Sequence, residues 1–269
     1  MAVADDRDRR LVGSIEKAFQ VLAVFNTTKR PMSLTELAID SGVERSATHR
    51  ILYTLRNLGY VRHDRKTRLY RLGAKLLELG DTYNHMNEVR SVAQPILEAA
   101  NQLCEETVNL TVMEGTEIVY VMRFPSRHVV SVDLRIGSRL PVYCTAPGRA
   151  ILAFLDEAAI SDVLDQSVLT QLTPFTITDR MEILQILDKV RQEGCCTTDQ
   201  ETFLGDISVA ATVFDADRFP IAAVNIAVPF PRWSHSSAKT ELLPIVIECA
   251  DRTSRSLAGD GLIDAADRA

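Results

Sequence analysis

The side chains best placed for chemistry in the first third of the sequence are cations and hydrogen-bond donors between Glu44 and Gly59. Apolar residues recur there every three or four positions and predict one apolar stripe on a helix, made of Val43, Ala47, Ile51, Leu55 and Leu58. At about 100° per residue, the opposite side carries polar and basic residues, which are Arg45, His49 and Arg56, with Ser46 and Tyr53 beside them and Arg50 on a flank. Such a helix packs inward while it offers hydrogen-bonding groups to the base edges of a DNA major groove.

The first turns of a recognition helix reach deepest into the groove. Base contacts are therefore expected from the first half of this helix in preference to Arg56, namely from Arg45, Ser46, Thr48, His49 and Arg50. A basic hairpin is predicted next, with strands at 60–63 and 68–72 around a turn at 64–67. Arg65 and Lys66 at its tip would contact phosphate or enter a minor groove. Taken singly, each charge fits an ordinary solvated surface, whereas the ordered set favours a winged helix that binds a duplex.

The residues that precede this helix fit the rest of a helix-turn-helix. Ser14 is expected to cap a helix that runs to about Phe25. The apolar side of that helix is predicted to be Ile15, Ala18, Phe19 and Leu22. Ser33 and Glu36 form a capping-box pattern for a second short helix, and Gly42 stands where the tight turn is needed.

Charge and composition support the same interpretation. Residues 1–75 hold 15 Lys and Arg against 8 Asp and Glu, whereas the rest of the chain holds 15 against 28. A basic end on an acidic protein is typical of a nucleic-acid binder with a second task, and a solvated basic face without a partner is the alternative. The length of 269 residues allows two packed cores. No apolar run approaches a membrane span and the N-terminus lacks the apolar part of a secretory signal, so a cytoplasmic protein with no membrane partner is expected.

The remaining sequence predicts a linker helix and a second domain. The linker helix at 74–86 is partly apolar and would seek an interdomain or dimer contact. The elements expected after it are helices at 92–104, 147–155, 179–193 and 237–257, a hairpin at 107–123, and strands at 129–134, 207–214 and 221–228. Strand pairs joined by short turns, with helices around them, predict an α+β fold with a largely antiparallel sheet. The expected domains are 1–73, a linker at 74–87, and 88–269.

Two stretches of the second domain could bind or transform a small molecule. At 140–150, small residues and Gly148 precede a helix start, where free N–H groups favour an anion. Asp199 and Glu201 would share a face if extended, and paired carboxylates can act as general acid and base; capping is the commoner role of such acids. Ser208 and Asn225 interrupt apolar strands, so they either satisfy backbone groups or face a ligand cavity.

Catalytic and cofactor motifs give little support to an enzyme. The sequence contains no phosphate-binding loop, no dinucleotide fingerprint and no nucleophile elbow. Its five histidines form no pair at helical ligand spacing, and its five cysteines are scattered and odd in number, which fits free thiols in a reducing compartment. No cofactor, no metal and no catalytic residue is expected, with a zinc site assembled in space as the alternative.

In their order and spacing, these motifs resemble the IclR-type bacterial transcriptional regulators. The resemblance runs from about Leu11 to Leu257. It is carried by the segments 33–38 with Gly42, 47–52 with Leu55, 58–61, 70–73, 144–146 with 148–150, and Asp199 and Glu201 with Gly205. It implies an N-terminal winged helix-turn-helix, a linker helix and a GAF-like effector domain that binds a small organic acid or a related metabolite. It also implies dimers, often paired into tetramers.

The resemblance further implies where an effector would bind. The implied positions map onto the loop before a helix, the region of Asp199 and two late strands, namely onto Ala146, Gly148, Asp199, Ser208, Asn225 and Ala227. Two departures matter here: Pro147 removes a backbone N–H that a carboxylate could use, and Ala227 lacks a hydroxyl that some relatives have. Both argue against glyoxylate or pyruvate and favour a bulkier acid, such as an aromatic one.

The leading expectation is therefore a regulator that binds a double-stranded DNA operator and whose affinity for it is modulated by an effector, without catalytic activity. The alternatives are a small-molecule enzyme that uses Asp199 and Glu201 and a DNA-binding protein that needs no ligand.

Overall fold

The computed structural model describes residues 10–128, 134–230 and 232–259. The chain forms two compact units, Met1–Met86 and Asn87–Ala269. The helix expected at the junction belongs to the first unit, so a separate linker at 74–87 stays a prediction. The strand expected at 129–134 lies almost wholly outside the described residues.

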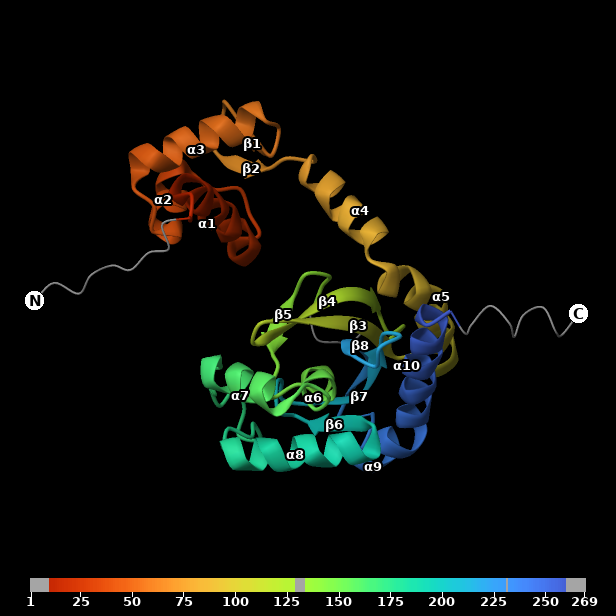
Figure 1. Cartoon of the computed structure of the whole chain (residues 1–269). Helices are drawn as coiled ribbons and strands as arrows, with labels where there is room; N and C mark the ends of the chain where they lie inside the picture. The colour runs from red at the N-terminus through yellow and green to blue at the C-terminus, as the bar shows by residue number, and fades with distance from the viewer. Residues whose placement is uncertain (1–9, 129–133, 231, 260–269) are drawn as a thin grey trace, which may run out of the picture. The chain divides into compact units, whose positions relative to one another are not determined.

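The first unit contains a three-helix cluster with a hairpin, followed by a fourth helix (Figure 1). Its elements in chain order are α1 (Gly13–Thr28), α2 (Leu34–Ser41), α3 (Arg45–Asn57), β1 (Val61–His63), β2 (Tyr70–Leu72) and α4 (Leu76–Met86). β1 and β2 pair antiparallel. Tyr70 of β2 exchanges two backbone hydrogen bonds with Met32, at 2.7 and 2.9 Å, and so ties the hairpin to the segment between α1 and α2.

The predictions for α1 were partly wrong. The helix starts at Gly13, its N-cap residue is Val12, and no side chain caps it, so Ser14 is not the cap. Ile15 and Phe19, predicted to face the core, are 55% and 67% exposed. The core is instead filled from this helix by Val21, Val24 and Phe25. Apolar residues occur all round this helix, so its sequence is compatible with more than one buried face. Packing buries the face formed by residues of its C-terminal half.

The turn between α2 and α3 agrees with the prediction. Ser33 and Glu36 form both hydrogen bonds of a capping box, and Gly42 adopts the left-handed conformation with φ of 68°. In α3 the buried side is formed by Thr48, Leu52 and Leu55. Leu58, predicted to lie on the apolar stripe, is 52% exposed, because it lies at the C-cap position where the helix has ended.

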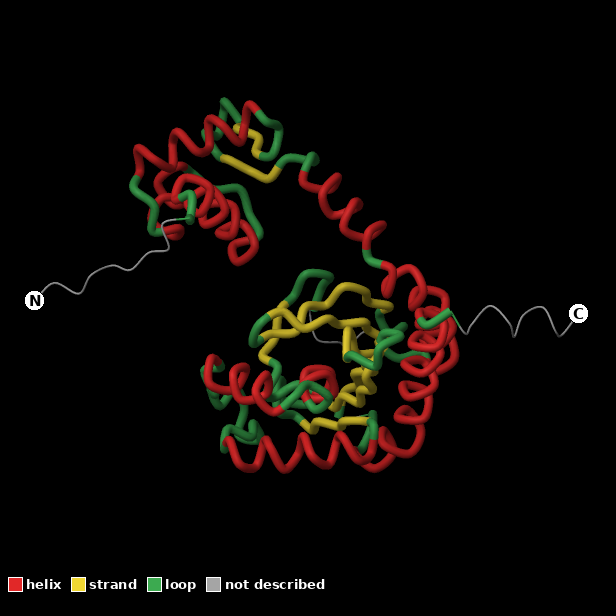
Figure 2. Tube along the Cα trace, viewed as in Figure 1, coloured by secondary structure: helices red, strands yellow, loops and turns green. Residues whose placement is uncertain are grey.

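The second unit is built on one six-stranded sheet that is antiparallel throughout the described strands and curls over its length (Figure 2). Across the sheet the order is β5, β4, β3, β8, β7, β6. The bounds are β3 (Thr107–Glu114), β4 (Glu117–Phe124), β5 (Arg139–Pro141), β6 (Cys195–Asp199), β7 (Asp206–Phe214) and β8 (Pro220–Pro229). The α+β class with an antiparallel sheet is thus confirmed.

Helices cover both faces of this sheet (Figure 1). One face packs on α5 (Glu88–Cys104) and α10 (Leu243–Leu257), with residues such as Leu97, Val224 and Val246 in the core between them. The other face packs on α6 (Ala146–Leu152) and α8 (Arg180–Glu193), next to α7 (Glu157–Gln166). The hairpin of β3 and β4, strands β7 and β8, and helices α6 and α8 were predicted from the sequence; α7 and the edge strands β5 and β6 were not.

The last predicted helix is interrupted. It consists of α9 (His235–Ser237), a π-helical turn η1 (Ala238–Leu242) and α10. Pro244 lies in the first turn of α10, and its nitrogen cannot donate to the oxygen four residues earlier. The chain widens into the π turn directly before that point. Among the described helices, none combines the length and hydropathy needed to cross a bilayer.

Candidate functional site

The exposed face of α3 and the hairpin form the first candidate site. The predicted contact residues Arg45, Ser46, His49 and Arg50 are all exposed. Glu44 is the N-cap of α3, where its carboxylate accepts hydrogen bonds from the backbone N–H groups of Ser46 and Ala47 at 2.9 and 3.0 Å. The Ser46 hydroxyl also donates to this carboxylate, so Ser46 is engaged within the protein. These bonds lower the pKa of Glu44, and a fixed negative charge therefore lies at the start of the helix.

Thr48 is a correction to the predicted contact set. Its side chain is fully buried, and its hydroxyl donates to the backbone oxygens of Val43 and Glu44 at 3.1 and 3.0 Å. Thr48 thus holds the first turn of α3 together and faces away from any duplex on the exposed side. The 3.6-residue period places position 48 next to Leu52 and Leu55 on the buried face.

The tip of the hairpin is a rigid basic turn. Asp64 accepts hydrogen bonds from the backbone N–H groups of Lys66 and Thr67 at 2.8 and 3.2 Å, and these bonds lower its pKa. Arg65 and Lys66 are exposed on this turn, as predicted. Only one acidic residue, Asp64, lies among the cations of this hairpin, which are Arg62, Arg65, Lys66, Arg68 and Arg71.

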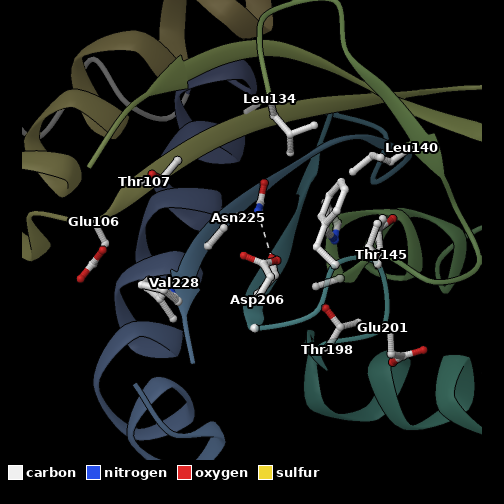
Figure 3. A pocket seen from close by; sticks show the side chains of 18 of the residues that line it. Glu106, Thr107, Leu134, Leu140, Thr145, Thr198, Glu201, Asp206, Asn225 and Val228 are labelled. Carbon is white, nitrogen blue, oxygen red and sulfur yellow. Dashed lines mark hydrogen bonds between the residues drawn. The ribbon is translucent and has the colours of Figure 1, made fainter. Parts of the chain in front are cut away.

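A cavity of about 200 Å³ in the second unit is the second candidate site (Figure 3). Residues of β3, β4, β7 and β8 line it on the sheet side, and residues of the start of α6 and of the loop between β6 and β7 close it. Leu134 and Leu140 supply apolar surface (Figure 3), and Leu140 lies on the edge strand β5. A cavity of roughly 150 Å³ accommodates a benzene ring, so this one has room for a small metabolite.

A row of polar side chains crosses the cavity face of the sheet. Arg123 on β4, Asn109 on β3 and Asn225 on β8 are successive partners in the strand register. Arg123 Nη1 donates to Asn109 Oδ1 at 2.9 Å, and Asn225 Nδ2 donates to Ser208 Oγ at 3.0 Å. Within the described part of the chain, Asn109 Nδ2 and Asn225 Oδ1 are buried without a hydrogen-bond partner. Such atoms are costly to leave unpaired. Asn225 lines the cavity, so its Oδ1 is an acceptor that a polar molecule in the cavity could satisfy.

Asp206 adds an acid to this cavity. It opens β7 and lines the cavity two residues before Ser208. Burial raises the pKa of Asp206 to about 7, against the opposing effect of Arg123. Arg123 is the cation among the described residues that line the cavity.

A buried ion pair holds the wall of the cavity. Arg149 Nη1 and Nη2 donate to the two carboxylate oxygens of Glu201, each at 2.6 Å, and both side chains are buried. Glu201 Oε2 also accepts from Ile177 N at 3.2 Å. The hydroxyl of Thr202 donates to Cys144 O at 2.9 Å. These bonds fasten the loop after β6 to α6 and to the segment before it.

Asp199 and Glu201 do not form the predicted carboxylate pair. Gln200 between them has a φ of 60°, which ends the extended run, so the two side chains do not share a face. Both oxygens of Glu201 are occupied by Arg149. Asp199 is absent from the cavity lining, and His235 lies 4.0 Å from it. Among the described residues no cluster of metal-ligating side chains occurs, and the five cysteines are free thiols.

Four of the six predicted effector positions line the cavity, and these are Ala146, Ser208, Asn225 and Ala227. Asp199 and Gly148 do not. A Cβ on Gly148 would lie 2.4 Å from Val142 O, so this glycine allows α6 to pack closely on the preceding loop. Its N–H is taken by the Thr145 hydroxyl at 3.3 Å, and Pro147 has none, so neither residue offers an N–H to an anion. Ala146, the first residue of α6, does line the cavity, and an anion site at this helix start stays a prediction.

Several cavity residues were not predicted from the sequence, notably Tyr120, Arg123 and Asp206. For Asp206 a signal was present. It stands two positions before Ser208, and alternate residues of a strand face the same side. For Arg123 no local signal existed, because only the strand register places it beside Asn109.

Two family profiles match the chain. The profile for the IclR helix-turn-helix domain matches residues 14–65, and the profile for the C-terminal part of bacterial IclR transcriptional regulators matches residues 81–255.

The chain belongs to the IclR family. It is a DNA-binding transcriptional regulator with an IclR-type effector domain at its C-terminal side. The Pca regulon regulatory protein of Pseudomonas putida is 32% identical over 241 residues, which cover 89% of this chain and 82% of that protein.

Solved structures agree with the family assignment. A candidate transcriptional regulator from Rhodococcus sp. RHA1 superimposes with a TM-score of 0.82 at 32% identity, over 93% of this chain and 99% of that one. An IclR homologue from Microbacterium hydrocarbonoxydans, solved in complex with 4-hydroxybenzoate, has the same fold, with a TM-score of 0.80 at 22% identity over 91% of this chain and 99% of that one.

Proposed function

We propose that this IclR-type regulator reads an operator with α3 and the basic hairpin and responds to a small organic acid in the cavity of its second unit. The observation that carries the proposal is the unpartnered Asn225 Oδ1 inside a cavity that also contains Arg123. A buried polar atom without a partner favours a polar ligand, and the guanidinium favours an anionic one.

Two observations support an organic acid with a single ring as the class of ligand. The Microbacterium homologue holds 4-hydroxybenzoate, and the volume of the cavity suits a single-ring compound. Arg45, Ser46, His49 and Arg50 are proposed as the base-reading group, and Arg65 and Lys66 as the phosphate contacts. The effector contacts are proposed at Ala146, Ser208, Asn225 and Ala227, to which Arg123 and Asp206 are added.

Assembly and location complete the proposal. A homodimer, or a homotetramer of paired dimers, suits a two-fold symmetric operator. The exposed apolar residues of α4, which are Leu77, Leu79, Tyr83 and Met86, fit a helix that packs on a second copy. A cytoplasmic location is part of the proposal, because a bacterial operator lies on the chromosome in that compartment. The enzyme alternative loses its support, because Glu201 is held by Arg149.

The test asks whether ligand binding in the cavity changes DNA binding by the same chain. Fluorescence anisotropy with an operator duplex, taken from the DNA upstream of the gene, measures affinity with and without millimolar organic acids. An acid that stabilises the protein in a thermal-shift assay should also change operator affinity, because linkage between two sites is reciprocal. A regulator that binds its operator identically under every stabilising acid would be the ligand-independent alternative. The variant Asn225→Leu, which removes the unpaired oxygen, should lose the response and keep operator binding.

A further inference from the structure

The acid at the start of β7 has no assigned role. The Asp206 side chain points into the cavity next to Asn225 (Figure 3). It lies on the same face of β7 as Ser208, which accepts the hydrogen bond from Asn225. Among the described residues, no group donates a hydrogen bond to the Asp206 carboxyl. This acid is thus part of the cavity surface and is not used to hold the fold together.

The other two acids of the cavity are engaged by cations. Glu106 accepts from Arg232 Nη2 at 2.5 and 2.6 Å and from Trp233 Nε1 at 2.8 Å. Glu201 is held by Arg149. Arg123 and Tyr120 of β4 are the remaining titratable side chains that line the cavity in the described chain. Asp206 is attracted by the charge of Arg123 but accepts no hydrogen bond from a described side chain, so its carboxyl oxygens are available to a ligand.

Asp206 and Asn225 together present hydrogen-bond acceptors. The amide nitrogen of Asn225 is used by Ser208, which leaves its Oδ1 as an acceptor without a donor. The Asp206 carboxylate is a second acceptor on the same wall. The single O–H of a ligand hydroxyl can donate to one of these acceptors, whereas a ligand carboxylate has no donor and is repelled by the ionised Asp206. A site built for a ligand hydroxyl rejects analogues that lack it, because its polar groups are then buried unpaired.

We propose that Asp206 sets the specificity of the cavity: it accepts a hydrogen bond from a hydroxyl group of the effector, and it excludes acids that place a second carboxylate there. The effector class is accordingly a hydroxylated monocarboxylic acid, with its carboxylate toward Arg123. This inference rests on the proposed function, since it names the chemistry of the ligand for the same cavity.

Hydroxy acids and dicarboxylates should differ in how their affinity for the cavity depends on pH. Burial raises the pKa of Asp206 to about 7. A hydroxyl donor binds better to the ionised carboxyl, so a hydroxy acid should bind more tightly as the pH rises from 6 to 8. A dicarboxylate would require the protonated carboxyl and should bind more tightly as the pH falls. Arg123, Tyr120 and the paired Glu106 and Glu201 face the same cavity, and the Asp206→Asn variant isolates the contribution of Asp206 from theirs.

The experiment is isothermal titration calorimetry on the full chain with matched acids at pH 6 and 8. The probes are 4-hydroxybenzoate, benzoate and terephthalate, together with the aliphatic set 4-hydroxybutyrate, butyrate and succinate. The proteins are the natural chain, Asp206→Asn, and the control Asp217→Asn, which removes the same charge from the exposed turn at the far end of β7. In the aromatic or the aliphatic series, the natural chain and the Asp217→Asn control should both bind the hydroxy acid with a dissociation constant about tenfold or more below that of the dicarboxylate at pH 8. Asp206→Asn should reduce this preference to within about threefold and abolish its pH dependence.

The outcomes separate the two proposals. Tighter binding of a dicarboxylate, equal binding of a simple monocarboxylate, or an unchanged preference in Asp206→Asn would overturn the role of Asp206 while the organic-acid proposal stands. Absence of binding by every acid to the folded natural chain would overturn both.

Discussion

Arg149 and Glu201, which are 52 positions apart in the sequence, form a buried two-bonded ion pair with both N–O distances at 2.6 Å. The pair joins α6 to the loop after β6, and both of these elements line the cavity. Removing one partner leaves the other charge buried and uncompensated, which typically costs about 3–5 kcal/mol.

The first prediction concerns this pair. Glu201→Gln and Arg149→Met should each lower the free energy of unfolding by about 3 kcal/mol or more, measured by urea denaturation of the full chain. The double variant should recover part of that loss, because no unpaired charge remains. Glu114→Gln, which breaks the exposed pair with Arg139, is the control and should cost less than about 1 kcal/mol. Equal losses at both pairs would contradict the burial argument.

The second prediction separates phosphate contacts from base contacts. Arg65→Ala and Lys66→Ala should weaken binding to every duplex alike, and each should reduce the slope of log K against log salt by about 0.9. Arg45→Ala and His49→Ala should instead reduce the preference for the operator over random DNA. Fluorescence anisotropy across a salt series measures both quantities. Arg218→Ala, on the exposed turn between β7 and β8, is the control cation. Identical losses on operator and random DNA for all four variants would reject this division.

The third prediction concerns Glu44, whose ionised carboxylate lies beside the proposed base contacts. Glu44→Ser keeps a residue that caps helices well and removes the negative charge. Because this charge repels phosphates, the variant should bind random DNA severalfold more tightly at low salt, and the gain should fade as salt screens the repulsion. An unchanged affinity for random duplex, with the helix content intact by circular dichroism, would mean that Glu44 stays away from the DNA backbone.

The fourth prediction is the pH dependence of stability that arises from Asp206. Its pKa is raised from 3.8 to about 7 by folding. Between these values the folded state binds a proton that the unfolded state does not, so stability falls as the pH rises toward 7, and above 7 the whole cost of a buried charge is present. Asp206→Asn should therefore be more stable than the natural chain at pH 8, by up to about 4 kcal/mol, and equal to it near pH 4. Thermal melts at a series of pH values, without added acid, check this crossover; a constant difference would contradict it.

The helix-turn-helix could be predicted from the sequence because local chemistry determines it. Ser33, Glu36 and Gly42 each act within a few residues of their own position. The α1 helix was harder, since its apolar residues surround it and only packing against α2 and α3 decides that Phe25 is buried and Phe19 is not.

The cavity was predictable only in part. Ser208 and Asn225 were found because polar residues interrupt apolar strands, whereas Arg123 and Asn109 meet through a register that no local pattern encodes. The sequence suggested that Glu201 could act as a general acid or base. Its carboxylate is instead bound by Arg149, which lies 52 residues away in the sequence. The segment 199–201 was expected to be extended, but Gln200 has a left-handed backbone conformation. This could not be predicted, because residues other than glycine rarely adopt that conformation.

Helix α4 has no buried residue, and four of its large apolar side chains are exposed to solvent in the single chain. An isolated helix of its 11 residues is marginal in water. A single chain thus contributes little to the stability of this helix, and the proposed dimer would stabilise it by covering those side chains. Helix α4 should therefore unfold first when the protein is diluted. Proteolytic cleavage within 76–86 should increase as the protein concentration is lowered, under conditions in which both hydrophobic cores are still folded.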